Sequence, residues 1–291
     1  MTSDCMTAIG TRTAIILVSI IATMDLKPAG AQPTAIAGSG EVTSAQIEST
    51  QPASGLTATN QNPFYLRVGV NLDLSSNSRF GDADCMSTSP AALYGCGRGN
   101  NGTSLGTLGD FETAAGVEVG LGFVATPKLR LESSMTYRPG IAFKGSANFV
   151  QTSADQVVTA DLWSMSGMVA AYMDLSAYGP LRLFAGSGAG LHYVDISNFR
   201  MTFPNTETVV PDGRNVDLTV MLTAGVATSL SDKITLDLDW RYLDRGIVQT
   251  GKAAGQVIWK DGRREPLEID LAETRAMLRG QGFRASLRYA F

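Results

Sequence analysis

The last ten residues of the chain, 282–291, alternate strictly between apolar side chains and polar or very small ones. Successive side chains of an extended strand point to opposite faces, so the two kinds separate. One face would carry Phe283, Ala285, Leu287, Tyr289 and Phe291, and the other Gly282, Arg284, Ser286, Arg288 and Ala290. The pattern favours a transmembrane β-strand with apolar side chains toward lipid and arginines toward a lumen. Such a strand needs partners, which the rest of the chain has to supply.

Seven further stretches alternate in the same way. They cover residues 64–74, 111–125, 129–138, 163–173, 181–195, 216–230 and 234–242. Short connections (126–128, about 176–180 and 231–233) alternate with long ones (about 75–110, 139–160, 196–215 and 245–281). We therefore predict that residues 63–291 form an all-β fold, an eight-stranded antiparallel up-and-down transmembrane β-barrel. Its short turns would be periplasmic and its four long loops extracellular.

The outward aromatic side chains give a check that does not depend on loop length. With both termini in the periplasm, one group falls at the extracellular end: Tyr137, Trp163, Tyr193, Trp240 and Tyr242. A second group falls at the periplasmic end: Phe64, Phe123, Tyr289 and Phe291. Two such girdles are typical of membrane barrels. A soluble eight-stranded barrel would be apolar inside and polar outside, the reverse of this pattern.

The N-terminal residues differ from the rest. An apolar run at 14–22 follows Arg12 and precedes the small-x-small site Ala29-Gly30-Ala31. These features predict a secretory signal peptide over 1–31. Residues 32–62, rich in Ser, Thr, Ala, Gln, Gly and Pro, predict a flexible periplasmic linker. With 31 glycines and 17% charged residues, the composition is atypical of a soluble enzyme, and we expect the bacterial outer membrane as the location.

Cys85 and Cys96 remain once the expected signal peptide, with Cys5, is removed. Both lie in one Gly/Ser/Asn-rich segment of an exported chain, which predicts a local disulfide. It would contribute about 3 kcal/mol to ordering the loop. A metal site on these thiolates is disfavoured because no histidine or third cysteine lies nearby.

Two strands carry a family resemblance. Residues 181–191, Leu-Arg-Leu-Phe-Ala-Gly-Ser-Gly-Ala-Gly-Leu, resemble the glycine-rich fifth strand of opacity-type barrels, which are related to the transmembrane domain of outer-membrane protein A. Residues 236–246 are similar to that family's penultimate strand, Leu-Asp-x-x-Tyr-Arg-Tyr, with Trp240 in place of the first Tyr. The resemblance covers about 62–291 and carries no catalytic residues. It implies an outer-membrane barrel whose terminal aromatic, here Phe291, is part of the signal read by the barrel assembly machinery.

Charged side chains on the predicted inner face nearly balance in sign. The arginines are Arg67, Arg130, Arg138, Arg182, Arg241, Arg284 and Arg288, and the carboxylates are Asp73, Glu118, Glu132, Asp217, Asp237 and Asp239. An unpaired charge in a narrow lumen is costly. We therefore predict that ion pairs plug the lumen, chiefly between the seventh, eighth and first strands. The members expected in this network are Arg67, Asp73, Glu118, Arg130, Glu132, Arg138, Asp237, Asp239, Arg241, Arg284 and Arg288.

Three function classes are compatible with this pattern. We favour a structural or surface-interaction barrel that acts through its loops, over a narrow porin. A lipid-modifying enzyme is a distant third, and it would need a serine or an acid within reach of His192, the only histidine. No zinc set, P-loop or nucleotide fingerprint is present, so we expect no enzyme activity, cofactor, metal or nucleic-acid partner. The expected partners are outer-membrane lipid, lipopolysaccharide, the assembly machinery and a host or surface ligand bound by the loops.

Overall fold

The structure is a computed structural model that describes residues 63–149 and 156–291, all within one unit, Ala58–Phe291. The predicted signal peptide (1–31) and linker (32–62) lie outside the described residues. Thirteen strands and no helix occur among the described residues. They are β1 (Phe64–Asp73), β2 (Ser76–Asp82), β3 (Thr107–Phe111), β4 (Ala114–Thr126), β5 (Leu129–Ala147), β6 (Val157–Tyr178), β7 (Leu181–Thr202), β8 (Thr206–Val209), β9 (Gly213–Ser229), β10 (Ile234–Gln249), β11 (Ala253–Trp259), β12 (Leu267–Leu271) and β13 (Thr274–Ala290). A search of this part of the chain for a helix long and apolar enough to span a membrane finds none.

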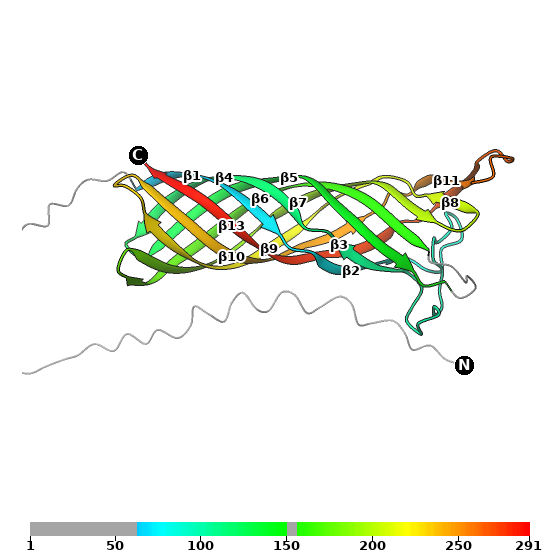
Figure 1. The fold of residues 1–291 in the computed structure, drawn as a ribbon, viewed down its shortest axis with the longest axis horizontal. Helices are drawn as coiled ribbons and strands as arrows, with labels where there is room; N and C mark the ends of the chain where they lie inside the picture. The colour runs from blue at the N-terminus through cyan, green and yellow to red at the C-terminus, as the bar shows by residue number, and fades with distance from the viewer. Residues whose placement is uncertain (1–62, 150–155) are drawn as a thin grey trace, which may run out of the picture. The chain divides into compact units, whose positions relative to one another are not determined.

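Eight of the strands close into a ring. The order is β1-β4-β5-β6-β7-β9-β10-β13, and β13 pairs back with β1, every pair being antiparallel. In the closing pair, Arg67 lies opposite Arg288 and Asn71 opposite Arg284. Closure leaves the ring without a free edge. The predicted eight-stranded antiparallel barrel is confirmed (Figure 1).

The two ends of the ring differ. The short connections β4–β5, β6–β7 and β9–β10 lie at the end where β1 begins and β13 ends, which we call the turn end. Gly179 has a φ of 60° in the β6–β7 turn, a conformation that favours glycine. The other end, which we call the loop end, carries β2, β3, β8, β11 and β12 (Figure 1).

The long loops are shorter than predicted, because the strands continue into them. β5 extends to Ala147 and β6 begins at Val157, although 139–160 was expected to be a loop. β13 begins at Thr274, well inside the expected loop 245–281. The prediction stopped each strand where the apolar-outward pattern stopped. The backbone ladder continues past that point with the opposite polarity.

Strand β13 displays this reversal with the same alternate residues facing inward throughout, although its pairing with β10 shifts register between Asp244 and Ile247. Near the turn end its buried residues are polar, as at Arg284 and Ser286, and exposed Leu287 lies between them and the terminus. Near the loop end its buried residues are Ala276 and Leu278, and exposed Arg275 lies on the outer face. The turn-end half therefore has the polarity of a membrane barrel, and the loop-end half has that of a soluble one.

On β5 the same reversal coincides with a bulge. The pairing of β5 with β6 shifts register between Arg138 and Ile141. Before the shift, Arg138 is buried and Tyr137 exposed, and after it Ile141 and Phe143 are buried. The extra residue re-aims the strand so that its apolar side chains enter the interior.

A hydrophobic core fills the loop-end half. Its members include Phe80, Phe111, Ile141, Phe143, Ile196, Phe199, Met201 and Leu278. The Phe80 ring centroid lies 4.9 Å from that of Phe143 and 5.2 Å from that of Phe199, both edge-to-face. Aromatic rings from β2, β5 and β7 therefore meet across the interior and fill it.

The disulfide between Cys85 and Cys96 closes a loop that packs on this core, as predicted. Tyr94 in the loop is buried, stacks on Phe149 at 5.8 Å between ring centroids, and hydrogen-bonds the Thr107 hydroxyl at 2.8 Å. The Asp82 carboxylate accepts three backbone N–H bonds, from residues 93–95, at 2.7–2.9 Å. Burial raises the pKa of Asp82, and those N–H donors oppose the shift. The loop thus caps the loop end.

Strands β8, β11 and β12 form a small sheet outside the closed ring. β8 pairs with β7 and with β11, and β11 pairs with β12. Figure 1 shows β11 and the turn that follows it projecting from the loop end. The capping loop covers part of the β12 side, where Ala91 pairs with Leu271.

Candidate functional site in the lumen

The structure places every residue predicted for the lumen network inside the turn-end half of the ring or at its boundary with the loop-end half. All eleven are buried, and each makes an ion pair: Arg67, Asp73, Glu118, Arg130, Glu132, Arg138, Asp237, Asp239, Arg241, Arg284 and Arg288. Period-two alternation puts them there, because each strand has apolar neighbours on its outer face.

Glu118 on β4 is the centre of the network. Arg241 and Arg284 each donate to it at 2.7 Å, one to each carboxylate oxygen, and Arg67 also contacts it. The Thr136 hydroxyl donates a further bond at 2.9 Å. One carboxylate therefore joins β4 to four other strands of the ring, in surroundings where the attraction is stronger than in water.

Arg284 and Arg67 extend the network to two further carboxylates. Arg284 Nε donates to Asp239 at 2.8 Å, and Arg67 contacts Glu132. Both guanidinium groups lie 5.7 Å from the centroid of the Tyr172 ring on β6. The long arginines thus reach across the lumen to Tyr172 on β6.

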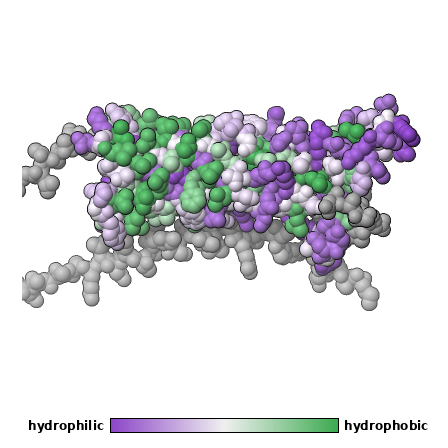
Figure 2. All heavy atoms as spheres, viewed as in Figure 1, coloured by the Kyte–Doolittle hydropathy of each residue, from purple (hydrophilic) through white to green (hydrophobic). Residues whose placement is uncertain are grey.

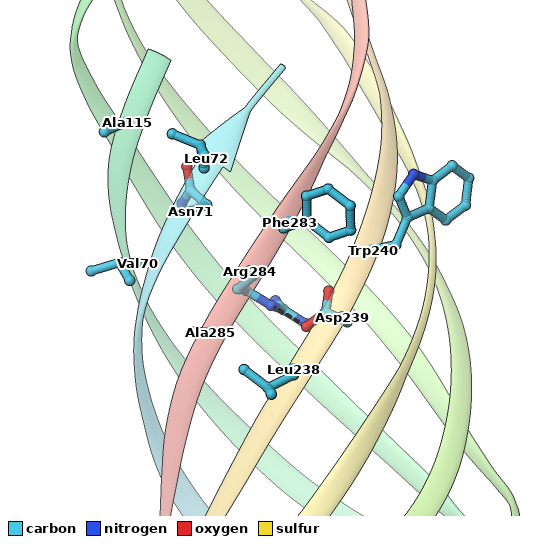
Figure 3. A pocket seen from close by; sticks show the side chains of 10 residues that line it. All are labelled: Val70, Asn71, Leu72, Ala115, Leu238, Asp239, Trp240, Phe283, Arg284 and Ala285. Atoms are coloured by element: carbon cyan, nitrogen blue, oxygen red, sulfur yellow. Dashed lines mark hydrogen bonds and ion pairs between the residues drawn. The ribbon is translucent and has the colours of Figure 1, made fainter. Parts of the chain in front are cut away.

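Figure 3 shows how one strand pair separates the two faces. Arg284 on β13 and Asp239 on β10 are opposite in register and joined by an ion pair inside the ring. The next pair in register, Phe283 and Trp240, is exposed on the outer wall. The same two strands therefore present a charged lumen and a lipid-type surface.

A second group of ion pairs lies nearer the turn end. Arg288 holds Asp237 through two nitrogens at 2.6 and 2.9 Å, and Arg130 donates to Asp174 at 3.2 Å. The Tyr65 hydroxyl donates to Glu132 at 3.1 Å, which connects this group to the central one. The turn-end lumen is thus filled with charged side chains.

The predicted pairing scheme was partly wrong. Arg284 and Arg288 pair with carboxylates of β10, as expected for the seventh and eighth strands. The charges of β1 also pair with β4 and β5, because Arg67 contacts Glu118 and Asp73 contacts Arg138. Asp73 contacts Arg245 of β10 as well, so one pair between the first and seventh strands is present. β4 is the ladder neighbour of β1 on the side away from β13, and β5 lies one strand further, within reach of a long arginine in a narrow ring.

Two inward charges were expected in the lumen and lie at its limits. Arg182 is half-buried near the turn end, where it donates to the Ser229 hydroxyl at 3.4 Å. Asp217 is half-buried near the loop end and accepts the backbone N–H of Ile247 at 2.9 Å. Neither forms an ion pair among the described residues.

Arg245 belongs to the network and was missed. It is buried and contacts Asp73, which also accepts from Arg138 Nε at 2.5 Å. The sequence held the signal, since Arg241, Leu243 and Arg245 keep the same parity along β10. The predicted strand ends at 242, and the predicted loop 245–281 contains Arg245. Tyr172 is a second residue that the prediction did not single out, and the guanidinium groups of Arg67, Arg130 and Arg284 lie over its ring.

His192 on β7 is buried in the lumen, near the boundary with the loop-end half. Its Nδ1 atom lies 2.9 Å from the Ser166 hydroxyl. A serine is therefore within reach of this histidine, as an enzyme would need. The apolar core lies on the loop-end side of this pair, and both side chains are buried. His192 Nε2 has no hydrogen-bond partner among the described residues. The described residues also contain no group of three His, Cys, Asp or Glu side chains that could hold a metal ion.

The outer wall divides at the aromatic side chains. Apolar residues gather over the turn-end half in Figure 2, and hydrophilic ones over the loop end. Between them, the rings of Tyr137, Trp163 and Tyr193 follow one another at 6.2 and 5.2 Å between centroids. At the turn end, Phe64 and Phe123 are 5.2 Å apart. Paired girdles of this kind mark the two membrane interfaces.

Residues 49–291 match the family model described as the outer membrane protein beta-barrel domain. The chain belongs to this family. Members of the outer membrane beta-barrel family are located in the bacterial outer membrane, so the turn end is periplasmic and the loop end extracellular.

Curated relatives match only part of the chain. Uncharacterized proteins of Brucella abortus and Brucella suis are 35% identical over 88 residues, which is 29% of this chain and 30% of each relative. The chain thus matches less than a third of the length of these relatives. Nothing about activity follows from that match.

Solved structures of outer-membrane proteins are similar at low identity. Neisserial surface protein A is 13% identical with a TM-score of 0.36, over 79% of this chain and 98% of that one. OprG from Pseudomonas aeruginosa is 9% identical with a TM-score of 0.44, over 79% and 97%. The Escherichia coli protease OmpT is 7% identical with a TM-score of 0.38, over 81% and 99%.

Proposed function

We propose that this outer membrane beta-barrel protein has a closed lumen and acts as a structural or surface-interaction protein through its extracellular half. The observation that carries the proposal is the presence of two barriers in series. The ion-pair network around Glu118 fills the membrane-spanning half. The aromatic core around Phe80 fills the half beyond it. An eight-stranded ring has room for side chains and little else.

The extracellular half has surface features that suit contact with another molecule. Its outer face is polar, and its exposed cations are interleaved with carboxylates, as in the pair Lys144–Glu112 at 2.7 Å. The projecting sheet adds Trp259, with the Arg264 guanidinium 5.5 Å from its ring centroid. Aromatic and arginine side chains on a projecting sheet suit binding of a host or surface ligand. Arg279 and Arg275, just beyond the girdle, suit the phosphates of lipopolysaccharide.

Assembly through the C-terminal strand forms part of the same proposal. β13 is the strand that closes the ring against β1, and Phe291 is exposed at the periplasmic rim beside Tyr289, 5.9 Å away between ring centroids. An exposed terminal aromatic is available for recognition by the assembly machinery before the ring closes.

Neither alternative function has comparable support. A porin needs a continuous aqueous path, and both halves of the lumen hold packed side chains. An enzyme built on Ser166 and His192 needs substrate access, and the aromatic core lies between that pair and the extracellular side.

Conductance in planar bilayers tests the proposal. We expect the purified wild-type protein to give no stable channel. Arg284→Ala and Arg67→Ala each remove a side chain that crosses the lumen. We expect neither variant to conduct ions by itself, and we expect conductance only when Phe143→Ala is added to open the apolar core. Large, stable conductance of the wild type would contradict the closed lumen and favour the porin.

A further inference from the structure

We infer that the upper lumen contains a binding site for one small monovalent anion, formed around Asp73, Arg138 and Arg245. The site lies between the Glu118 network and the aromatic core. It is independent of the proposed function, because an anion could be held there whether or not the protein contacts a surface ligand.

Counting charge pairs locates one excess cation. Five buried arginines each have a carboxylate of their own: Arg67–Glu132, Arg241–Glu118, Arg284–Asp239, Arg288–Asp237 and Arg130–Asp174. The two that remain, Arg138 and Arg245, share the single carboxylate of Asp73. Both guanidinium groups are buried, so the site carries one positive charge more than it can neutralise. A buried charge without a counterion is strongly unfavourable.

Nearby carboxylates do not supply the missing charge. Asp217 lies opposite His192 in register and accepts the backbone N–H groups of Ile247 at 2.9 Å and Leu218 at 2.7 Å, but it forms no ion pair with Arg138 or Arg245 among the described residues. Arg241 lies close enough to repel Arg245 and adds positive potential rather than reducing it. Among the described residues, Asp73 is the only carboxylate in an ion pair with Arg138 or Arg245.

Donors without partners surround the same place. Arg138 Nη1, Arg245 Nε, Ser164 Oγ and Asn71 Nδ2 are buried and have no hydrogen-bond partner among the described residues, and the same holds for two acceptors, Asn71 Oδ1 and Asp73 Oδ1. Ser164 lies opposite Arg138 in register. A Cβ at Gly116 would lie 2.6 Å from Asn71 Oδ1 and 2.9 Å from Arg138 Cγ, so these two side chains flank the glycine together.

The enclosure and the donors define the ligand class. The next buried residue after Arg138 on β5 is Ile141, so the site is bounded on the extracellular side by apolar side chains. On the periplasmic side it meets the Glu118 network through Arg241. N–H and O–H donors with a single excess charge suit a small monovalent anion such as chloride. Water would satisfy the donors but would not neutralise the charge.

Anion-dependent stability tests the inference on the full chain. The protein is refolded and unfolded by heat in detergent at constant ionic strength, with chloride replaced stepwise by gluconate, a much larger monovalent anion. We expect the unfolding midpoint of the wild type to rise with the logarithm of chloride concentration, as for any ligand that binds only the folded state. An unchanged midpoint across the series would overturn the inference.

Two variants and a control identify the site. Arg245→Gln removes the excess charge, and we expect its midpoint not to depend on chloride. Asn71→Asp places a carboxylate where the anion would act, so we expect a high midpoint in gluconate and no chloride dependence, even if Arg245→Gln fails to fold. Asn77→Asp makes the same change on the exposed face of β2 and should keep the wild-type dependence. If Asn71→Asp retained the slope of the wild type, the inference would be wrong.

Discussion

Replacing Arg284 with methionine should be among the most damaging single changes in the membrane-spanning half. Arg284 donates to Glu118 at 2.7 Å and to Asp239 at 2.8 Å, and its side chain is buried. Without it, Glu118 keeps Arg67 and Arg241, but Asp239 keeps only the Thr223 hydroxyl at 2.8 Å. A carboxylate left buried without a cation costs about 3–5 kcal/mol.

The contact of Arg284 with the Tyr172 ring adds to that loss. The guanidinium lies 5.7 Å from the ring centroid, and a cation–π contact contributes roughly 0.5–2 kcal/mol. The buried methionine side chain offsets part of the total. We therefore expect Arg284→Met to lower the free energy of unfolding by about 4 kcal/mol.

Urea unfolding of protein refolded into lipid vesicles, followed by tryptophan fluorescence, measures this difference by linear extrapolation. The matched control is Arg279→Met on the same strand, which breaks the more exposed pair with Asp244 at 2.8 Å and should cost less than about 1 kcal/mol. Adding Asp239→Leu to Arg284→Met should restore most of the loss, because an apolar pair replaces the orphaned charge. If Arg284→Met cost no more than Arg279→Met, the account of a dry, coupled network would be refuted.

Three further outcomes are expected. Leu222→Arg on the lipid face should cost about 2–4 kcal/mol near the midplane, whereas Thr223→Arg should act through crowding of the lumen; equal losses with water-accessible Leu222 would reverse the face assignment. Replacing both Cys85 and Cys96 with serine should remove about 3 kcal/mol of loop ordering, so that protease cuts the loop at 83–106 faster while the boiling-dependent gel shift of the barrel persists; unchanged cleavage would exclude a capping role. Deleting Phe291 should lower the amount of protein in the outer membrane, and unchanged levels would exclude it as an assembly signal.

The sequence was sufficient for the membrane-spanning half because polarity there is uniform. Along β1 and β13 every second residue is apolar, as in Val68, Val70 and Leu287, and the structure exposes all of them. Parity then assigns the remaining side chains to the lumen, so the list of inward charges follows without knowledge of partners. Partners could not be predicted, because they depend on how far Arg67 and Arg241 reach across the ring rather than on ladder position.

The strands of the extracellular half could not be predicted in this way, because their apolar side chains face inward and their polar side chains face outward. Phe143 and Ile141 on β5 are buried, and a bulge after Arg138 changes which parity faces inward. A rule that seeks apolar residues on the outer face ends the strand at that point. The same error hid Arg245, whose parity with Arg241 would have placed it in the lumen had β10 been continued.

The central claim is that one closed barrel has opposite polarity in its two halves, and accessibility along β13 tests it most directly. Single cysteines at Ala276, Met277, Ala285 and Ser286, in a chain with Cys5 replaced by serine, would carry spin labels in lipid vesicles. We predict that the label at Met277 contacts a water-soluble relaxation agent, that the label at Ala285 contacts oxygen dissolved in lipid, and that those at Ala276 and Ser286 contact neither. A label at Ala285 exposed to water, or one at Met277 exposed to lipid, would contradict the account.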